Sequence, residues 1–127
     1  MKCMYEVVFY RDEKGNSEIL EFLDELEKKS YTNKDARIQY KQIIIYLQLL
    51  QEHGTCLGEN MTKHIDEDIW ELRPGHNRVF YFYYKNNQFV ILHHFRKKTQ
   101  KTPNREMQKA KRERDDYKKR GGIYESK

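Results

Sequence analysis

The chain of 127 residues contains only two cysteines, Cys3 and Cys56, which lie far apart and lack CxxC spacing. Small secreted domains that rely on disulfides carry a denser set of cysteines, and a zinc site or a redox motif requires closer spacing. We therefore expect two reduced, structural cysteines in a cytoplasmic protein.

Long hydrophobic runs are also missing. The apolar run MYEVVFY at residues 4–10 is interrupted by Glu6 and is followed at once by charged residues. A membrane-spanning helix needs about 20 apolar residues, and a secretory signal needs an uninterrupted apolar stretch. The run satisfies neither requirement, so we expect no membrane partner.

The six glycines form no phosphate-cradling loop, and the chain has no nucleophile-elbow motif. His53, His64 and His76 have no metal-ligand spacing with cysteines or acidic residues. The adjacent His93 and His94 should point to opposite faces of a strand, where they cannot chelate one ion. We therefore expect no metal and no cofactor.

The chain is instead rich in charged and aromatic residues. Charged residues make up 35% of it, and it holds ten Tyr, six Phe and one Trp, a composition unlike that of disordered chains. Residues 93–127 carry 13 Lys/Arg and 5 Asp/Glu, a net charge of +8, whereas residues 1–92 carry 12 and 15, a net charge of −3. A basic end on a mildly acidic body favours a polyanionic partner. A solvated helix face explains the same charges equally well.

The spacing of apolar residues predicts one α+β domain over residues 1–127. Apolar residues three and four positions apart predict helices, and β-branched and aromatic runs predict strands. The expected order begins with an N-terminal strand (4–10) and a two-helix hairpin (17–29 and 34–53). An antiparallel three-strand meander (68–73, 78–85 and 88–96) follows. A C-terminal basic helix then begins at Pro103 and is closed by Gly121 and Gly122.

The simplest hairpin registers place Arg73 opposite Arg78 on adjacent strands. They also pair Glu71 with Phe80, Arg78 with Phe95, Phe80 with His93, Phe82 with Ile91, and Tyr84 with Phe89. One face of the sheet should then receive the two helices through Trp70, Leu72, Val79, Tyr81, Val90 and Leu92. The other face should carry Arg73, Arg78, Glu71, His93 and several aromatic residues.

Two facing arginines require an explanation, because like charges directly opposite each other destabilise a sheet. Guanidinium groups bind phosphate oxygens in pairs, and exposed aromatic rings stack on unpaired bases. This face is therefore expected to bind a phosphate backbone. The structural alternative is that Arg73 pairs with Glu71, while Phe80 and Phe82 belong to the core.

The stretch HHFRKKTQKTP at residues 93–103 favours the phosphate-binding interpretation. It should return a group of cations to the same end of the sheet, where they would repel one another without an anion: Arg96, Lys97, Lys98 and Lys101. His93 could assist proton transfer there, although a packed or surface histidine is the commoner case. Lys109, Lys111 and Arg112 of the basic helix are expected to add phosphate contacts that do not depend on base sequence.

Three segments carry a family resemblance: WELRPGHNRVFYFYY, ILHHFRKKTQKTP and MQKAKRERDDY, at residues 70–84, 91–103 and 107–117. Following a strand and a helical hairpin, they resemble the RelE/ParE superfamily of toxin–antitoxin toxins, in its phage-related HigB-like branch. The resemblance covers roughly residues 4–120. It implies a RelE-like fold and a toxin that inhibits translation by cleaving mRNA in the ribosomal A site.

The resemblance places basic residues of the family at Arg73, Arg78, Lys97, Lys98 and Lys101. The strand registers and the charge pattern add His93, Arg96, Lys109, Lys111 and Arg112. Arg73, Arg78, Lys98 and Lys101 would be catalytic, and Lys97, His93, Arg96, Lys109, Lys111 and Arg112 would bind RNA. The RNA 2′-hydroxyl would attack the adjacent phosphate without a metal. Met107 stands where RelE has a tyrosine that helps to activate the nucleophile, and Tyr117 lies too far along the helix to replace it.

The expected partners are the ribosome, mRNA and a cognate helix-turn-helix antitoxin, with operator DNA contacted only through the antitoxin. Two other functions are compatible with the same sequence. One is a ParE-like inhibitor of DNA gyrase, and the other is an RNA-binding module without catalytic activity.

Overall fold

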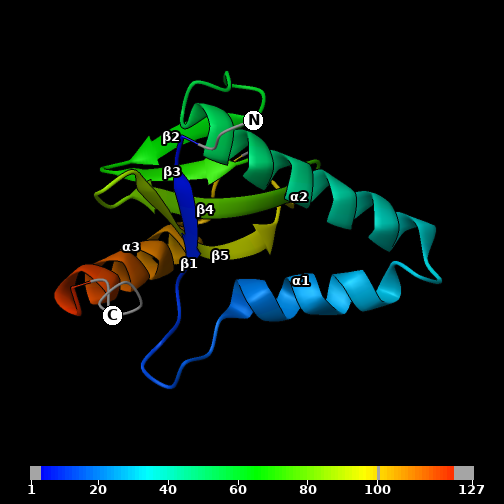
Figure 1. Ribbon diagram of the computed structural model, residues 1–127, viewed down its shortest axis with the longest axis horizontal. Coiled ribbons are helices and arrows are strands. Elements are labelled where there is room, and N and C mark those ends of the chain that lie inside the picture. The colour runs from blue at the N-terminus through cyan, green and yellow to red at the C-terminus, as the bar shows by residue number, and fades with distance from the viewer. Residues whose placement is uncertain (1–3, 100, 122–127) are drawn as a thin grey trace.

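The computed structural model describes residues 4–99 and 101–121, which form five strands and three helices. The elements are β1 (Glu6–Phe9), α1 (Glu18–Lys29), α2 (Lys34–His53), β2 (Thr62–Asp66), β3 (Ile69–Leu72), β4 (Asn77–Tyr83), β5 (Gln88–Arg96) and α3 (Asn104–Lys119). The strands form one sheet in the order β1-β5-β4-β3-β2, with α1 and α2 on one side and α3 on the other (Figure 1).

The two predicted helices of the hairpin are confirmed, and local capping explains where they begin. The hydroxyl of Ser17 accepts a hydrogen bond from the Leu20 amide at 3.3 Å, and the Asn33 side chain accepts one from the Ala36 amide at 2.9 Å. Each cap satisfies an amide that has no partner within the helix. At its other end α2 stops at Gly54, whose φ of 60° favours glycine.

The predicted strand layout needs two corrections. First, the sequence analysis missed β2, which pairs antiparallel with β3 at the edge of the sheet. Its Lys63 and His64 are exposed, so the strand lacks the apolar pattern from which strands are predicted. Second, β1 pairs parallel with β5, so the sheet is mixed and extends the antiparallel meander on both sides.

The predicted register holds at one end of the meander and fails at the other. Glu71 pairs with Phe80, and Arg78 pairs with Phe95, as expected. Between Val79 and Tyr81, however, β5 contains one extra residue, which is a β-bulge. Consequently Phe82 pairs with Val90 rather than Ile91, and Tyr83 rather than Tyr84 pairs with Phe89. The loop between β4 and β5 spans residues 84–87, and it is closed by a hydrogen bond that the Tyr84 amide donates to the Gln88 carbonyl.

Two apolar cores lie on opposite faces of the sheet. As predicted, the face that packs on α1 and α2 includes Trp70, Leu72, Val79 and Tyr81. The prediction for Val90 and Leu92 was wrong, because the bulge turns them toward α3, while Phe89 and Ile91 face α1 and α2.

The face opposite α1 and α2 is covered by α3 rather than open to solvent. Phe80 and Phe82 are fully buried, and they form one apolar cluster with Met107 and Tyr117 of this helix. The expectation that aromatic residues of this face stack on bases is therefore wrong, and the structural alternative for Phe80 and Phe82 is correct. Within residues 4–99 and 101–121, no helix is both long and apolar enough to cross a membrane.

Candidate functional site

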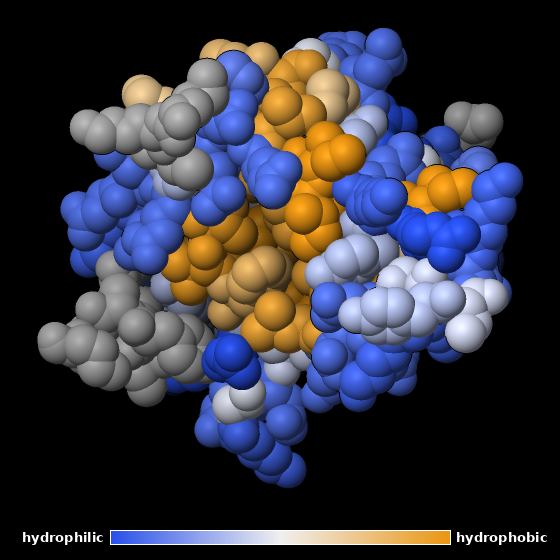
Figure 2. Space-filling model, turned by 45° about the vertical axis from the view of Figure 1, so that its right-hand side comes forward, coloured by the Kyte–Doolittle hydropathy of each residue, from blue (hydrophilic) through white to orange (hydrophobic). Residues whose placement is uncertain are grey.

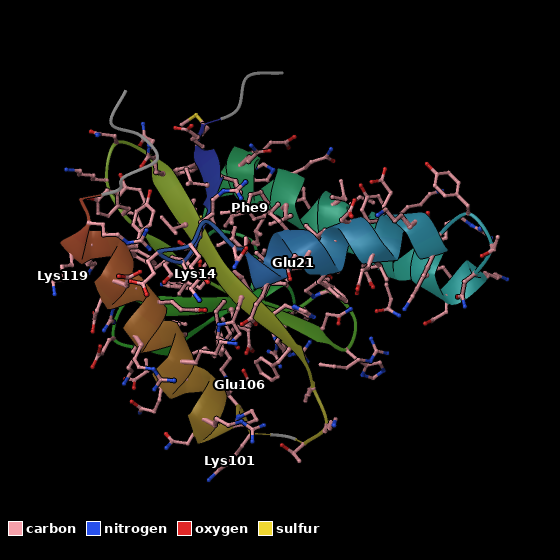
Figure 3. The ribbon with its side chains drawn as sticks, turned by 90° about the horizontal axis from the view of Figure 1, so that it is seen from below. Phe9, Lys14, Glu21, Lys101, Glu106 and Lys119 are labelled. Carbon is pink, nitrogen blue, oxygen red and sulfur yellow. The ribbon has the colours of Figure 1, made fainter. Side chains whose placement is uncertain are left out.

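A small cationic pocket lies at the end of the sheet where β3 leads into β4. Its volume is about 10 Å³, and it is lined by Glu71, Arg73, Arg78, Phe95, Lys97, Thr99, Lys101 and Thr102. A wider depression of about 610 Å³ shares Arg78, Lys97 and Thr99 with it and adds Lys98. The pocket lies next to the start of α3, where Figure 3 shows Lys101, whereas Lys119 marks the far end of that helix.

Glu71 is the residue around which the two predicted arginines meet. Its Oε2 lies 3.6 Å from Arg73 Nε and 3.8 Å from Arg78 Nε, and its Oε1 accepts a hydrogen bond from the Thr102 hydroxyl at 3.4 Å. The Glu71 side chain is only 4% exposed. The structural alternative for Arg73 is therefore realised, and the repulsion between the facing arginines is relieved by one buried carboxylate.

Backbone carbonyls fix both arginines. Arg78 donates from Nη1 to the carbonyl oxygens of Gly75 and Asn77, each at 2.8 Å, and its side chain is 8% exposed. Arg73 donates from Nη1 to the Glu59 carbonyl at 3.2 Å and is 26% exposed. These bonds hold the guanidinium groups in place without using the Glu71 carboxylate as a hydrogen-bond acceptor.

Burial shifts the pKa values of Glu71 and Arg78. The pKa of the Glu71 carboxyl is raised, because desolvation by burial outweighs the attraction of Arg78 and Arg73. The pKa of Arg78 is lowered, again mainly by desolvation, although Glu71 opposes the change. The carboxylate is thus held in a place that disfavours its charged form.

The charge balance of the pocket still favours an anion. Arg73, Arg78, Lys97 and Lys101 face a single carboxylate among the residues that line it. Guanidinium and ammonium groups that converge on one small volume attract phosphate or another oxyanion. The pocket and the wider depression beside it can therefore attract an oxyanion, and the pocket also holds one group that can accept a proton.

His93, predicted to bind RNA, is not accessible. Its side chain is 1% exposed, with Nδ1 2.7 Å from Glu113 Oε1 and Nε2 3.0 Å from Glu106 Oε1. His93 lies on the predicted face of the sheet, but α3 covers that face, and the histidine joins the helix to the sheet. His93 is therefore not available to contact RNA.

Arg96 lies outside the pocket lining. It is exposed at the end of β5, and it donates to the side chain of Gln39 on α2 at 3.0 Å. Of the four cations in the predicted cluster at the end of β5 and beyond it, the structure brings Lys97 and Lys101 to the pocket and Lys98 to the adjoining depression.

Two of the three predicted RNA-binding cations on α3 are already paired. Lys109 Nζ lies 2.7 Å from Glu18 of α1, and Lys111 Nζ lies 2.6 Å from Asp66 of β2. These contacts fasten the helix to the rest of the molecule, so both ammonium groups serve the fold. Arg112 is exposed, and the structure shows no ion pair for it among the described residues.

The last helix supplies no tyrosine to the pocket. Met107 is buried in the core beneath α3. Tyr117 packs edge-on against Phe82 and Tyr84, toward the end of β4 that lies away from Arg78. As expected from the sequence, Tyr117 is too far along α3 to reach the pocket.

Glu71 is the site residue that the sequence analysis missed. It was expected on the same face as the arginines and as a possible partner for Arg73, but it was given no role in the site, whereas it lines the pocket and contacts both arginines. A signal was present, because residues two positions apart on a strand share a face. The ELR sequence therefore places Glu71 beside Arg73, opposite Arg78.

The family described as phage derived protein Gp49-like (DUF891) matches residues 18–115. The matched range contains every residue that lines the pocket and most of α3. No curated protein matches the chain.

Proposed function

Because the chain belongs to the Gp49-like family of phage-derived proteins, which is a family of type II toxin–antitoxin toxins, we propose that it is a toxin that cleaves mRNA on the ribosome. The proposal places it in the HigB-like branch of the RelE/ParE superfamily, which its sequence resembles. A toxin that acts on translating ribosomes works in the cytoplasm.

The observation that carries this proposal is the convergence of four cations on one small pocket. Arg73 and Arg78 are fixed by backbone carbonyls, so they need no rearrangement to receive a phosphate. Preorganised donors of this kind stabilise charge that develops in a transition state. A protein that only contacts another protein has no need for such a cluster in a pocket.

The proposed reaction is an attack of the RNA 2′-hydroxyl on the adjacent phosphate. Arg73 and Arg78 hold the phosphate oxygens and stabilise the pentavalent transition state. Lys101, in the pocket, and Lys98, in the adjoining depression, neutralise the oxyanion or the leaving 5′-oxygen. Each fixed donor aimed at developing charge typically contributes about 10²–10³-fold to the rate.

Family membership suggests an antitoxin partner, and we propose that it is a helix-turn-helix protein that alone contacts operator DNA. The surface has room for a protein partner. Figure 2 shows a band of apolar residues on one face, bordered by polar residues. Large apolar side chains that are exposed on the described part of the chain include Tyr31, Ile38, Ile45 and Tyr83.

The test is a single-turnover cleavage assay on ribosomes that carry a defined mRNA. We expect the protein to cut mRNA in the A site, and Arg73→Ala to abolish cutting. Mapping of mRNA 5′ ends in cells, with and without induction, checks the same activity in vivo. Naked RNA of the same sequence shows whether the ribosome is required.

The alternative functions give different results in these assays. A gyrase inhibitor would leave mRNA intact and would block DNA supercoiling by gyrase. A non-catalytic RNA-binding module would bind ribosomes or RNA without producing new 5′ ends. Either outcome would overturn the proposed nuclease activity, whereas toxicity alone would not separate the three.

A further inference from the structure

We propose that Glu71 is the general base of this pocket and accepts the proton of the attacking 2′-hydroxyl. The inference rests on the proposed function, because it names the proton acceptor for that reaction. Nothing in the family match or in the sequence resemblance assigns this role.

Chemical elimination within the pocket points to Glu71. The other polar residues that line it are arginines, lysines and threonines, which hold their protons at neutral pH. Glu71 is the one carboxylate of that lining, and no histidine belongs to it. His76 lines only the adjoining depression, and His93 is enclosed by glutamates of α3.

The geometry leaves the Glu71 carboxylate able to accept a proton. Its Oε2 faces Arg73 and Arg78 at 3.6 and 3.8 Å, distances that are long for hydrogen bonds. The Nη1 atoms of both arginines are used by backbone carbonyls instead. The carboxylate is therefore oriented by charge and by the Thr102 hydroxyl while its oxygens keep accepting capacity.

The electrostatic environment supports the same role. Burial raises the pKa of Glu71 even though Arg78, Arg73 and Lys63 all oppose the change. A general base is more effective when its pKa approaches the working pH, because its conjugate acid then holds the proton more strongly. A phosphate bound by the two arginines adds a negative charge nearby, which raises the pKa of Glu71 further.

The proposed step balances in protons and bonds. The 2′-O–H bond breaks and its proton goes to Glu71, while the 2′-oxygen forms a bond to phosphorus. The bond from phosphorus to the 5′-oxygen breaks, and that oxygen takes a proton from the Lys101 ammonium. The products are a 2′,3′-cyclic phosphate and a 5′-hydroxyl, and proton transfer through water from Glu71 to Lys101 restores the starting state.

The first test is the pH dependence of single-turnover cleavage on programmed ribosomes at saturating protein. For the wild type, we expect the rate to rise about tenfold per pH unit and then level as Glu71 loses its proton. Glu71→Gln keeps the shape of the side chain and its contact with Thr102, but it cannot take the proton. We expect a rate about 10²–10⁴-fold lower without this rising limb.

A substrate with sulfur in place of the 5′-oxygen separates the base from the acid. Sulfur leaves without a proton, so a defect in the acid disappears on this substrate while a defect in the base persists. We expect Lys101→Ala to cleave the thio substrate nearly as fast as the wild type does. Glu71→Gln should remain slow on both substrates.

Two further variants keep the test decisive. Glu71→Asp retains a carboxylate, so it should keep the rising limb at a reduced rate, even if Glu71→Gln fails to fold. Glu25→Gln changes an exposed glutamate of α1 far from the pocket and should leave rate and profile unchanged.

The outcomes separate the two proposals. If the wild type cleaves RNA and Glu71→Gln shows the same rate and pH profile, Glu71 is not the base, although the nuclease proposal stands. Loss of the rising limb in His76→Gln but not in Glu71→Gln would assign the base to His76. If the wild type cleaves no RNA, the proposed function and this inference both fail.

Discussion

The Arg78 side chain is fixed to the turn that precedes its own strand, because Nη1 donates a 2.8 Å hydrogen bond to the carbonyl oxygen of Gly75. Gly75 has a φ of 63°, and its carbonyl direction depends on this left-handed conformation. Arg78 is thus part of the turn as well as part of the pocket. Arg73, which directly follows β3, is anchored less tightly and is more exposed.

This difference predicts different effects of removing the two arginines. Arg78→Ala leaves the Gly75 and Asn77 carbonyls and Glu71 with fewer partners, so we expect a loss of about 2 kcal/mol in the free energy of unfolding. Arg73→Ala should change that free energy by less than about 1 kcal/mol. Both should abolish growth arrest on induction. Urea unfolding and growth after induction measure the two effects, and full toxicity of folded Arg73→Ala would contradict the prediction.

The two lysines after β5 should also differ. Lys101 lines the enclosed pocket, whereas Lys98 lines only the wider depression. We expect Lys101→Ala to lower the single-turnover rate about 10²-fold with little change in affinity. Lys98→Ala should mainly weaken binding to programmed ribosomes. Titration of the protein at fixed ribosome concentration separates the maximal rate from the affinity, and identical effects of the two variants would refute this placement.

On α3, Arg112 should bind RNA, whereas Lys111 should stabilise the fold. Arg112→Glu should weaken RNA or ribosome binding equally for all codons and reduce the log–log salt slope by about 0.7 to 0.9. Lys111→Glu places a negative charge beside Asp66 and Glu67, so it should lower the melting temperature as well. Thermal melts of both variants, run with the binding assays, test this division. An unstable Arg112→Glu protein would show that this arginine also serves the fold.

The sequence predicts the elements whose own residues determine them. Caps at Ser17 and Asn33 and a regular apolar stripe set the two hairpin helices. The turn before Asn77 sets the register of β3 against β4, which brings Arg73 and Arg78 to the same end of the sheet. These features depend on neighbours in the chain, and sequence reasoning finds them.

Features that depend on distant contacts were not predictable. β5 contains the continuous apolar run Val90, Ile91 and Leu92, which fits the sheet in either register, so its bulge leaves no signal. α3 covers an aromatic face although most of its residues are charged. Ion pairs such as Arg114 with Asp68, at 2.6 Å, hold it there, and sequence alone shows only a basic, apparently solvated helix.

The buried carboxylate should reduce stability at neutral pH. The folded-state pKa of Glu71 is raised by burial, so its contribution to stability is fully present below the unfolded-state pKa and is lost as pH rises through the folded-state pKa. In Glu71→Gln the side chain resembles the protonated, neutral glutamate. At pH values above the folded-state pKa of Glu71, this variant should therefore melt at a higher temperature than the wild type. The difference should shrink as the pH is lowered. A Gln variant that is less stable at neutral pH would show that the charge of Glu71 supports the fold.

His94 should make the protein sensitive to acid. Its ring stacks on Phe22 with centroids 3.7 Å apart, and its Nδ1 is buried without a hydrogen-bond partner among the described residues. Burial, with a smaller effect of the neighbouring His93, lowers the pKa of His94 to about 4. Because the neutral ring is favoured in the fold, the stability it contributes is complete above pH 6.5 and is lost as pH falls toward 4.

Replacing His94 should therefore flatten the pH dependence of unfolding. Between pH 6.5 and 4 the unfolded chain binds a proton at this position and the folded chain does not, a difference of about 3 kcal/mol in all. His94→Phe keeps a ring against Phe22 and removes the titrating group, so its free energy of unfolding should fall less steeply over this range. Urea unfolding at several pH values between 7 and 4 measures both slopes. Equal slopes for the two proteins would mean that the acid sensitivity arises elsewhere.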